Sequence, residues 1–357
     1  MNSKKIELRF TLIRTLIAIL IAYSLALIII LFASKQPLTA ISLFLFGPLT
    51  SFRRFANVIE MMIPFIFTGL AITVMQKANS FNVIGEGVFF ISGAVSAYIA
   101  INTALPAVLS PMVLILVSGI LGALIALIPA ILKLKWKANE LVSSIMMNYI
   151  LFFFSMYLLN YWMRDINAGY NASYKIPLVS KLPVIIPGTR IHFGLILAII
   201  AVAVISFIMY KTKLGYSITM VGENEKFANY SGIKTVSIIL IAQMIGGFLA
   251  GVGGSVEILG MYNRFQWEVL TNHGFDGVLV GVLSRKNPLV LPVSAFFLAY
   301  MRTGADIAAR STDIPVEFVS VVQAIVLMLV GAQMFLEAWK KRAIVKSIEN
   351  SPKVEVQ

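Results

Sequence analysis

The chain has 357 residues, of which 59% are hydrophobic and only 13% are charged, and its mean hydropathy is +0.89. A soluble domain carries about 25% charged residues, so this composition excludes an ordinary water-soluble protein. With no cysteine and only His192 and His273, the chain has no disulfide framework, thiolate metal site or histidine cluster. The net charge of +13 is divided among short basic clusters between apolar runs, which indicates membrane topology rather than nucleic-acid binding.

Apolar runs long enough to cross a hydrocarbon core of about 30 Å recur along the chain. The first follows a basic start and is too long for a signal peptide, so we expect an uncleaved helix. The eighth and ninth runs are short, so eight or nine spans are the alternatives to a preferred count of ten. The ten predicted spans are residues 12–33, 57–75, 84–101, 111–132, 141–161, 193–210, 235–256, 274–284, 288–302 and 316–335.

The distribution of basic residues predicts the orientation. Most Lys and Arg residues fall on one side of alternate spans when both termini are placed in the cytoplasm. The predicted organisation is a cytoplasmic N-terminus (1–11), a transmembrane domain (12–335) and a charged cytoplasmic tail (336–357). Within the domain, the punctuated stretch 162–192 is expected to be an ordered external loop. The charged stretch 211–234 is expected to be a cytoplasmic loop with one or two short helices, broken at Gly215 and Gly222.

Four carboxylates fall inside or at the edge of apolar spans: Glu60, Glu86, Glu140 and Asp276. A charged side chain costs at least about 2.5 kcal/mol at the bilayer centre, so each should face protein, water or a partner. The alternative is that each caps a helix end near the interface. That alternative is favoured for Glu60 and Glu140, which lie close to predicted ends.

Two short stretches pair an aromatic and a polar residue with glycines. Phe81-Asn82-Val83-Ile84-Gly85-Glu86-Gly87 begins on the predicted cytoplasmic side, and Gly274-Phe275-Asp276-Gly277 begins on the outer side. This arrangement is expected of two inverted halves, spans one to five against six to ten. The predicted fold is therefore an all-α polytopic membrane protein of about ten transmembrane helices, with two inverted five-helix halves.

Other polar and glycine-rich stretches have two interpretations each. Ser144 and Asn148 are four residues apart, so they share one helical face that either bonds a neighbouring helix, the commoner outcome, or lines a solute path. The glycines within 246–254 follow no strand, which favours close helix packing over a nucleotide loop. No G-x-x-x-x-G-K-[ST] motif is present, so the chain itself is not expected to bind ATP.

Three stretches resemble a known family. They are SFNVIGEG at 80–87, KANELVSSIMMNYI at 137–150, and 211–233 followed by 246–289, which contain GYSITMVGENEKFANYSGI and GFDGVLVGVLSRKNPL. The chain resembles the permeases of the ribose, branched-chain amino-acid and nucleoside class of bacterial ABC importers. It is most similar to the nucleoside branch that works with a basic-membrane-protein-type lipoprotein. The likeness covers most of 57–335, although the family's glycine usually stands two places earlier than Gly85.

The resemblance implies partners and a cytoplasmic coupling helix at Gly215–Ile233. The partners would be ATPase subunits that bind ATP and Mg, a second permease forming a heterodimer, and an extracytoplasmic lipoprotein that delivers a nucleoside. No cofactor, metal or nucleic acid is expected on this chain. The residues expected at the ATPase are Gly215, Gly222, Glu223, Ala228, Tyr230 and Gly232.

The expected function is therefore the membrane permease of an ATP-driven importer in the bacterial cytoplasmic membrane, for nucleosides or related simple sugars. The rival is a secondary transporter that acts alone, with Glu86 and Asp276 as ion or proton sites. An enzyme is not expected, because no nucleophile–base pair or metal cluster is present. A base would stack on an aromatic ring while amides and carboxylates bind ribose hydroxyls. The residues expected to line the solute path are Asn82, Glu86, Asn148, Phe275 and Asp276.

Overall fold

A computed structural model describes residues 34–103 and 109–313, together with single positions near residues 24–31, 106 and 320–324. The described residues form helices joined by turns and loops, with two isolated β-bridges and no strand among them. The all-α class is thus confirmed. Apart from those single positions, the predicted spans 12–33 and 316–335, the N-terminus 1–11 and the tail 336–357 lie outside the described residues.

Six described helices are long and apolar enough to cross a membrane. They match six of the predicted spans to within five residues at each end. The ten-span count stays a prediction. The six are α3 (Phe52–Lys77), α4 (Gly85–Asn102), α5 (Leu109–Trp136), α6 (Glu140–Leu158, continued to Met163 by a π-turn), α7 (Gly194–Lys211) and α10 (Thr235–Met261).

Two further helices follow α10 in the chain. Helix α11 (His273–Leu283) is shorter than a spanning helix, and α12 (Leu291–Ser311) continues well past the predicted end at residue 302. His273 is the first residue of α11 and is buried, with its ring 5.7 Å from that of Phe65 and 5.2 Å from that of Phe89.

The chain divides into two units, one of residues 48–303 and one of residues 1–47 with 304–357. The described part of the second unit contains α2 (Pro37–Phe46), a helix that the search for spanning runs did not predict. Within this unit, Asp313 accepts hydrogen bonds from the Ser34 hydroxyl and the Lys35 amide, both at 2.7 Å.

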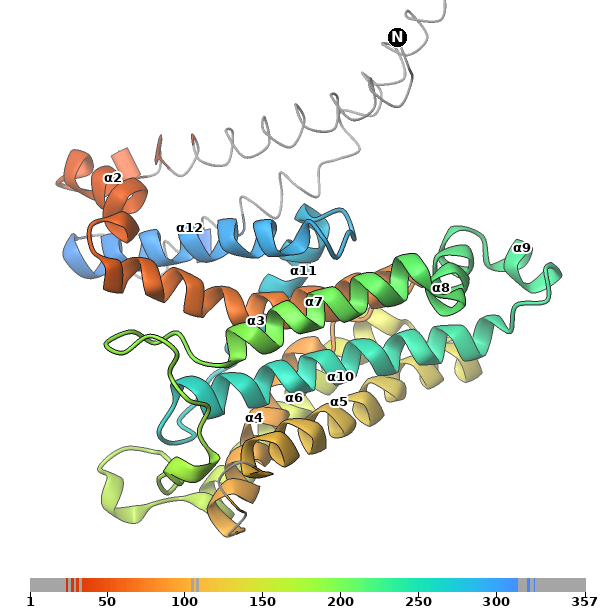
Figure 1. Cartoon of the computed structure of the whole chain (residues 1–357), viewed down its shortest axis with the longest axis horizontal. Coiled ribbons are helices and arrows are strands. Elements are labelled where there is room, and N and C mark those ends of the chain that lie inside the picture. Colours follow the sequence, from red (N-terminus) through yellow and green to blue (C-terminus); the bar gives the residue numbers. More distant parts are fainter. Residues whose placement is uncertain are drawn as a thin grey trace, which may run out of the picture. The chain divides into compact units, whose positions relative to one another are not determined.

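In the larger unit, α5 and α10 pack backbone to backbone along their length (Figure 1). A Cβ at Gly247 would lie 2.3 Å from the Gly122 carbonyl oxygen, and a Cβ at Gly251 would lie 2.2 Å from that of Ser118. Only glycine allows this separation. The predicted role of the glycines in helix packing is therefore confirmed.

Replacing Gly251 by valine is expected to lower the free energy of unfolding by about 3 kcal/mol or more, because the α5 backbone must move away. Gly85→Ala is the matched control, because a Cβ there meets nothing closer than 3.9 Å. Thermal unfolding of both variants in detergent checks the difference. Equal melting temperatures would contradict the packing role.

The stretch 211–234 forms α8 (Lys213–Glu223) and α9 (Glu225–Tyr230), as expected of one or two short helices. The predicted breaks at Gly215 and Gly222 are wrong, because both glycines lie inside α8 and the break is at Asn224. The glycines instead allow close approach: a Cβ at Gly215 would lie 2.3 Å from the Ile208 carbonyl oxygen. Helices α8 and α9 lie at one end of the larger unit, and residues 162–192 lie at the other (Figure 1).

The loop 162–192 is held against the segment that follows α10. Ser173 and Ile176 donate backbone hydrogen bonds to Phe265 and Asn263, each at 2.9 Å, and Arg264 pairs with Asp165 at 2.6 Å. The hydrogen bond from Arg264 holds the pKa of Asp165 below its usual range. Burial, with a smaller effect of Lys181, lowers the pKa of His192 to about 4, so this ring is neutral at physiological pH.

Candidate solute path and coupling surface

The first turns of α4 and α11 meet inside the larger unit, and Glu86 lies between them. Its carboxylate accepts hydrogen bonds from the amide of Asn272 at 2.8 Å, the amide of Gly274 at 2.6 Å and the hydroxyl of Thr271 at 3.2 Å. The N-terminus of a helix carries a partial positive charge and unpaired amides. A carboxylate from the start of one helix thus caps the start of the other.

The two helices begin beside the central part of α3 and run in opposite directions. Along α3, Phe65 lies beside His273, Thr68 beside Gly277, and the carbonyl of Gln76 accepts from Lys286, so α11 runs parallel to α3. Helix α10 packs antiparallel to α3, with Gly246 near Met75 and Gly253 near Phe67, and α4 runs parallel to α10. Discontinuous helices whose N-termini meet at mid-depth are typical of transporter sites.

The structure thus brings together the two stretches that the sequence paired, although inverted halves remain a proposal. Asp276, in the first turn of α11, forms an ion pair with Arg302 of α12. Arg302 also lies over the ring of Phe65, 5.8 Å from its centroid. The side chain of Phe275, which precedes Asp276 in the chain, is 37% exposed, whereas the side chains of Glu86 and Asp276 are buried.

Asn148 and Asn82 are both buried, and their amide groups hold the segment between α3 and α4. Asn148 accepts from the Gly87 amide at 2.9 Å and donates to the Val83 carbonyl at 3.0 Å, while Ser144 accepts from the Val83 amide at 3.2 Å. Asn82 accepts from the Ile84 amide at 3.0 Å. The polar face of α6 therefore bonds a neighbouring segment, which was the commoner of the two predicted outcomes.

A polar network continues from this segment to α5, α6 and α10. Asn82 donates to Gln243 at 2.8 Å, Gln243 donates to Glu140 at 3.3 Å, and Lys133 pairs with Glu140 at 2.7 Å and bonds Ser80 at 3.2 Å. Glu140 is the first residue of α6, so its predicted position at a helix end is confirmed.

Lys133→Ala is expected to destabilise the protein by about 1 to 3 kcal/mol, because the buried carboxylate of Glu140 loses its cation. The matched control is Asp306→Asn, which breaks the exposed pair with Arg310 and should change stability by less than about 0.5 kcal/mol. Melting temperatures measured on both purified variants compare them. A larger effect of the control would contradict the network's role.

Glu60 was expected near a helix end, and this is wrong. Helix α3 starts at Phe52, so Glu60 lies more than two turns inside it and is 3% exposed. The carboxylate of Glu60 interacts electrostatically with that of Glu257 on α10. Glu257 interacts in the same way with Arg302 and Tyr262. The Oε2 atom of Glu257 is buried without a hydrogen-bond partner. Sequence reasoning missed Glu257 and Arg302, although a charge within an apolar run was a sufficient signal.

The predicted coupling residues form one end of the larger unit. A Cβ at Gly222 would lie 1.8 Å from the carbonyl oxygen of Lys77, the last residue of α3. Ala228 is buried, whereas Tyr230 is 92% exposed and Glu223 is exposed. Gly232 has a φ of +83°. These residues therefore combine exposed side chains with a close backbone contact to the end of α3.

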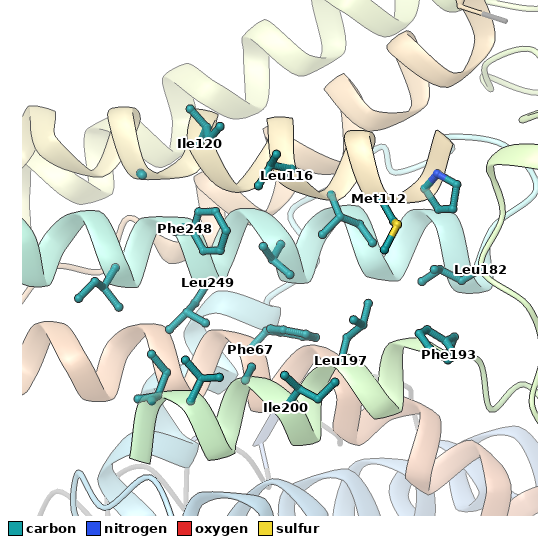
Figure 2. Close-up of a pocket in the computed structure, with 18 of the residues that line it drawn as sticks. Phe67, Met112, Leu116, Ile120, Leu182, Phe193, Leu197, Ile200, Phe248 and Leu249 are labelled. Atoms are coloured by element: carbon teal, nitrogen blue, oxygen red, sulfur yellow. The ribbon is translucent and has the colours of Figure 1, made fainter. Parts of the chain in front are cut away.

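A large cavity of about 1090 Å³ lies elsewhere, between α5 and α7 over α10. Figure 2 shows Leu116 and Ile120 of α5, Phe248 of α10, and Leu197 and Ile200 of α7 around it. Nearly every lining side chain is apolar, Lys181 being the one charged residue. A polar solute would lose its hydrogen bonds there, so this cavity is not a candidate for the solute path.

These features are those of a polytopic membrane permease: several apolar helices of spanning length, two helix N-termini that meet inside the unit, and a pair of short helices at one end. A family model described as "Branched-chain amino acid transport system / permease component" matches residues 54–331. The chain belongs to this family, and the resemblance identified from the sequence is confirmed. No solved structure matches the chain significantly.

Several curated proteins are similar over most of their length. A nucleoside ABC transporter permease protein of Lactococcus lactis subsp. cremoris is 28% identical, over 92% of this chain and 93% of its own. A glucose ABC transporter permease protein of Haloferax volcanii is 27% identical, over 85% of this chain and 83% of its own. A guanosine ABC transporter permease protein of Bacillus subtilis is 26% identical, over 77% of this chain and 80% of its own.

Proposed function

We propose that this chain is the permease subunit of an ATP-driven importer that carries nucleosides, or related simple sugars, across a bacterial cytoplasmic membrane. Family membership and the relatives named for nucleosides and guanosine support the class of protein and solute. Ten spans in two inverted halves, with both termini inside, complete the proposed topology. ATP and Mg bind to separate ATPase subunits, a second permease completes the path, and an external lipoprotein delivers the solute.

The observation that carries the energy coupling is the contact between Gly222 of α8 and the end of α3. Movement of α8 by a docked ATPase is transmitted directly to α3. From there it reaches α11, because Lys286 binds the carbonyl of Gln76 at 3.2 Å. The proposed cycle is alternating access, in which ATP-dependent contacts favour one of two states. The solute path includes Phe275 and passes the junction of Glu86 and Asp276, which Asn82 and Asn148 support.

The direct test is uptake in cells that lack their own nucleoside transport. Co-expression of this chain with a second permease, a lipoprotein and an ATPase of the proposed importer should give nucleoside uptake. Replacing the P-loop lysine of the ATPase should abolish it. Uptake that persists with the inactive ATPase would reject the proposal.

Topology is tested with single cysteines, since the chain has none of its own. We expect Tyr230→Cys to react with an impermeant thiol reagent only after the cells are opened, and Ile166→Cys to react in intact cells. Both side chains are highly exposed, at 92% and 87%, so accessibility differs only by side of the membrane. Labelling of Tyr230→Cys from outside would reverse the orientation and remove the coupling role of α8 and α9.

A secondary transporter that acts alone is the second candidate, and the buried carboxylates of Glu60 and Glu257 favour it. The ion sites expected from the sequence, Glu86 and Asp276, are occupied by amides and by Arg302. Uptake by the purified chain in liposomes, driven by a proton or sodium gradient without ATP, would support this candidate over the importer.

A further inference from the structure

The exposed face of helix α6 contains a row of aromatic residues along the helix. Tyr149, Phe153, Tyr157 and Tyr161 recur every four residues and are 48 to 77% exposed. The rings of Tyr157 and Tyr161 are 5.0 Å apart. We call these four residues the aromatic stripe. It lies on the side of α6 away from Ser144 and Asn148, which bind the start of α4.

The exposed faces of α5 and α7 away from the cavity are mainly aliphatic. Outside the cavity, α5 exposes Val117, Ile128 and Ile131, and α7 exposes Ile196 and Ile199 in addition to the aromatic Phe207 near its end. These aliphatic side chains match the hydrocarbon of a bilayer, where polar groups without partners are costly. The aromatic stripe contains three hydroxyl groups, and no hydrogen bond to a described residue is present for Tyr149, Tyr157 or Tyr161.

An aromatic belt at the membrane surface does not account for the stripe. Belt residues stay at the interface, whereas the stripe runs from Tyr161 through Tyr149, about 18 Å along the axis at 1.5 Å per residue. The helical segment Glu140–Met163 has 24 residues. Tyr149 lies about 14 Å along the axis from Glu140, which places it near the middle of this segment. A tyrosine hydroxyl at that depth requires water, a solute or a polar partner.

We propose that the aromatic stripe of α6 is a second part of the solute path, separate from the junction of Glu86 and Asp276, on which the base of an uncharged nucleoside stacks. Successive rings provide equivalent stacking positions along the path, and the hydroxyls bind ribose or base edges. Stacking on an aromatic ring tolerates every base, because each base has a π-face. No charged residue occurs between Leu141 and Met163, so the stripe fits a nucleoside better than a nucleotide. This inference rests on the proposed function, because it assumes nucleoside transport.

The accessibility of the stripe can be measured in the assembled importer with single cysteines. Tyr149→Cys, Phe153→Cys and Tyr157→Cys should react with a water-soluble thiol reagent at least tenfold faster than Ile196→Cys and Ile199→Cys on α7. Guanosine in excess should slow the reaction at the stripe and leave that on α7 unchanged. Reaction as slow as on α7 would place the stripe in lipid or in a dry subunit contact and overturn the proposal.

Stacking itself is tested by uptake kinetics. Phe153→Leu and Tyr157→Leu should raise the KM for guanosine at least fivefold, and Phe153→Trp should keep it near the wild-type value. The matched control is Phe207→Leu, which removes an aromatic ring that is 62% exposed on α7 and should leave KM unchanged. An unchanged KM in both stripe variants would overturn the stacking role. If the wild-type importer carried no nucleoside, the proposed function would be rejected instead. The thiol reaction rates would still show whether the stripe is accessible to water.

Discussion

Glu86→Ala is expected to destabilise the protein by about 3 to 5 kcal/mol. The substitution leaves the amides of Asn272 and Gly274 and the hydroxyl of Thr271 without their acceptor in a buried site. Each unsatisfied buried group costs about 1 to 3 kcal/mol. It also leaves two helix N-termini facing each other without a compensating negative charge. Melting temperature and the folded yield in detergent measure the loss.

Glu86→Gln separates hydrogen bonding from charge, because the amide keeps one acceptor oxygen and loses the negative charge. We expect a stability between wild type and Glu86→Ala. Glu268→Ala is the control, since Glu268 is exposed and its removal should change the melting temperature little. A fully stable Glu86→Ala protein would show that water or another group replaces the carboxylate at the junction.

The spans were predictable from the sequence because bilayer thickness fixes their length. The boundaries of α4 and α7 fall within one residue of the predicted spans. Helix α2 was missed because its ten residues are too few to cross a bilayer. The end of α12 was missed because the residues after Tyr300 include Arg302, Asp306 and Arg310, which interrupt the apolar pattern.

The candidate site was predictable in part. A carboxylate within an apolar run must find a partner, so Glu86 and Asp276 could be chosen without a structure. Which partner each finds depends on segments far apart in the chain: Glu86 and Gly274 are separated by 188 residues. Glu60 was misplaced because α3 starts at Phe52, where two arginines break the apolar run.

The structural role of the glycines in 211–234 was the feature that the sequence predicted least well. The φ of Gly232, +83°, fits a turn. Gly215 and Gly222 look like helix breakers in the same stretch, yet both are helical. Their function is to let other backbone segments approach, and this depends on α3 and α7, which sequence patterns in the loop do not reveal.

Gly222 is consequently the position where we expect the largest loss of transport without loss of the folded permease. Gly222→Val places side-chain atoms where the Lys77 carbonyl oxygen lies, because a Cβ at this position would be only 1.8 Å from that oxygen. Helix α8 must therefore move away from the end of α3. Uptake should fall at least tenfold. The ATPase should still co-purify, because the exposed residues of α8 and α9 are unchanged.

The matched control for this prediction is Ser217→Ala, in the same helix. The Ser217 hydroxyl donates to the carbonyl of Lys213 in its own helix, at 2.9 Å, and its removal adds no bulk at the contact with α3. We expect wild-type uptake from this variant. ATP hydrolysis that continues in Gly222→Val without uptake would locate the defect in transmission from α8 to α3. Wild-type uptake in Gly222→Val would mean that the force of the ATPase reaches the membrane helices by another route, because no rotamer of valine fits beside that carbonyl group.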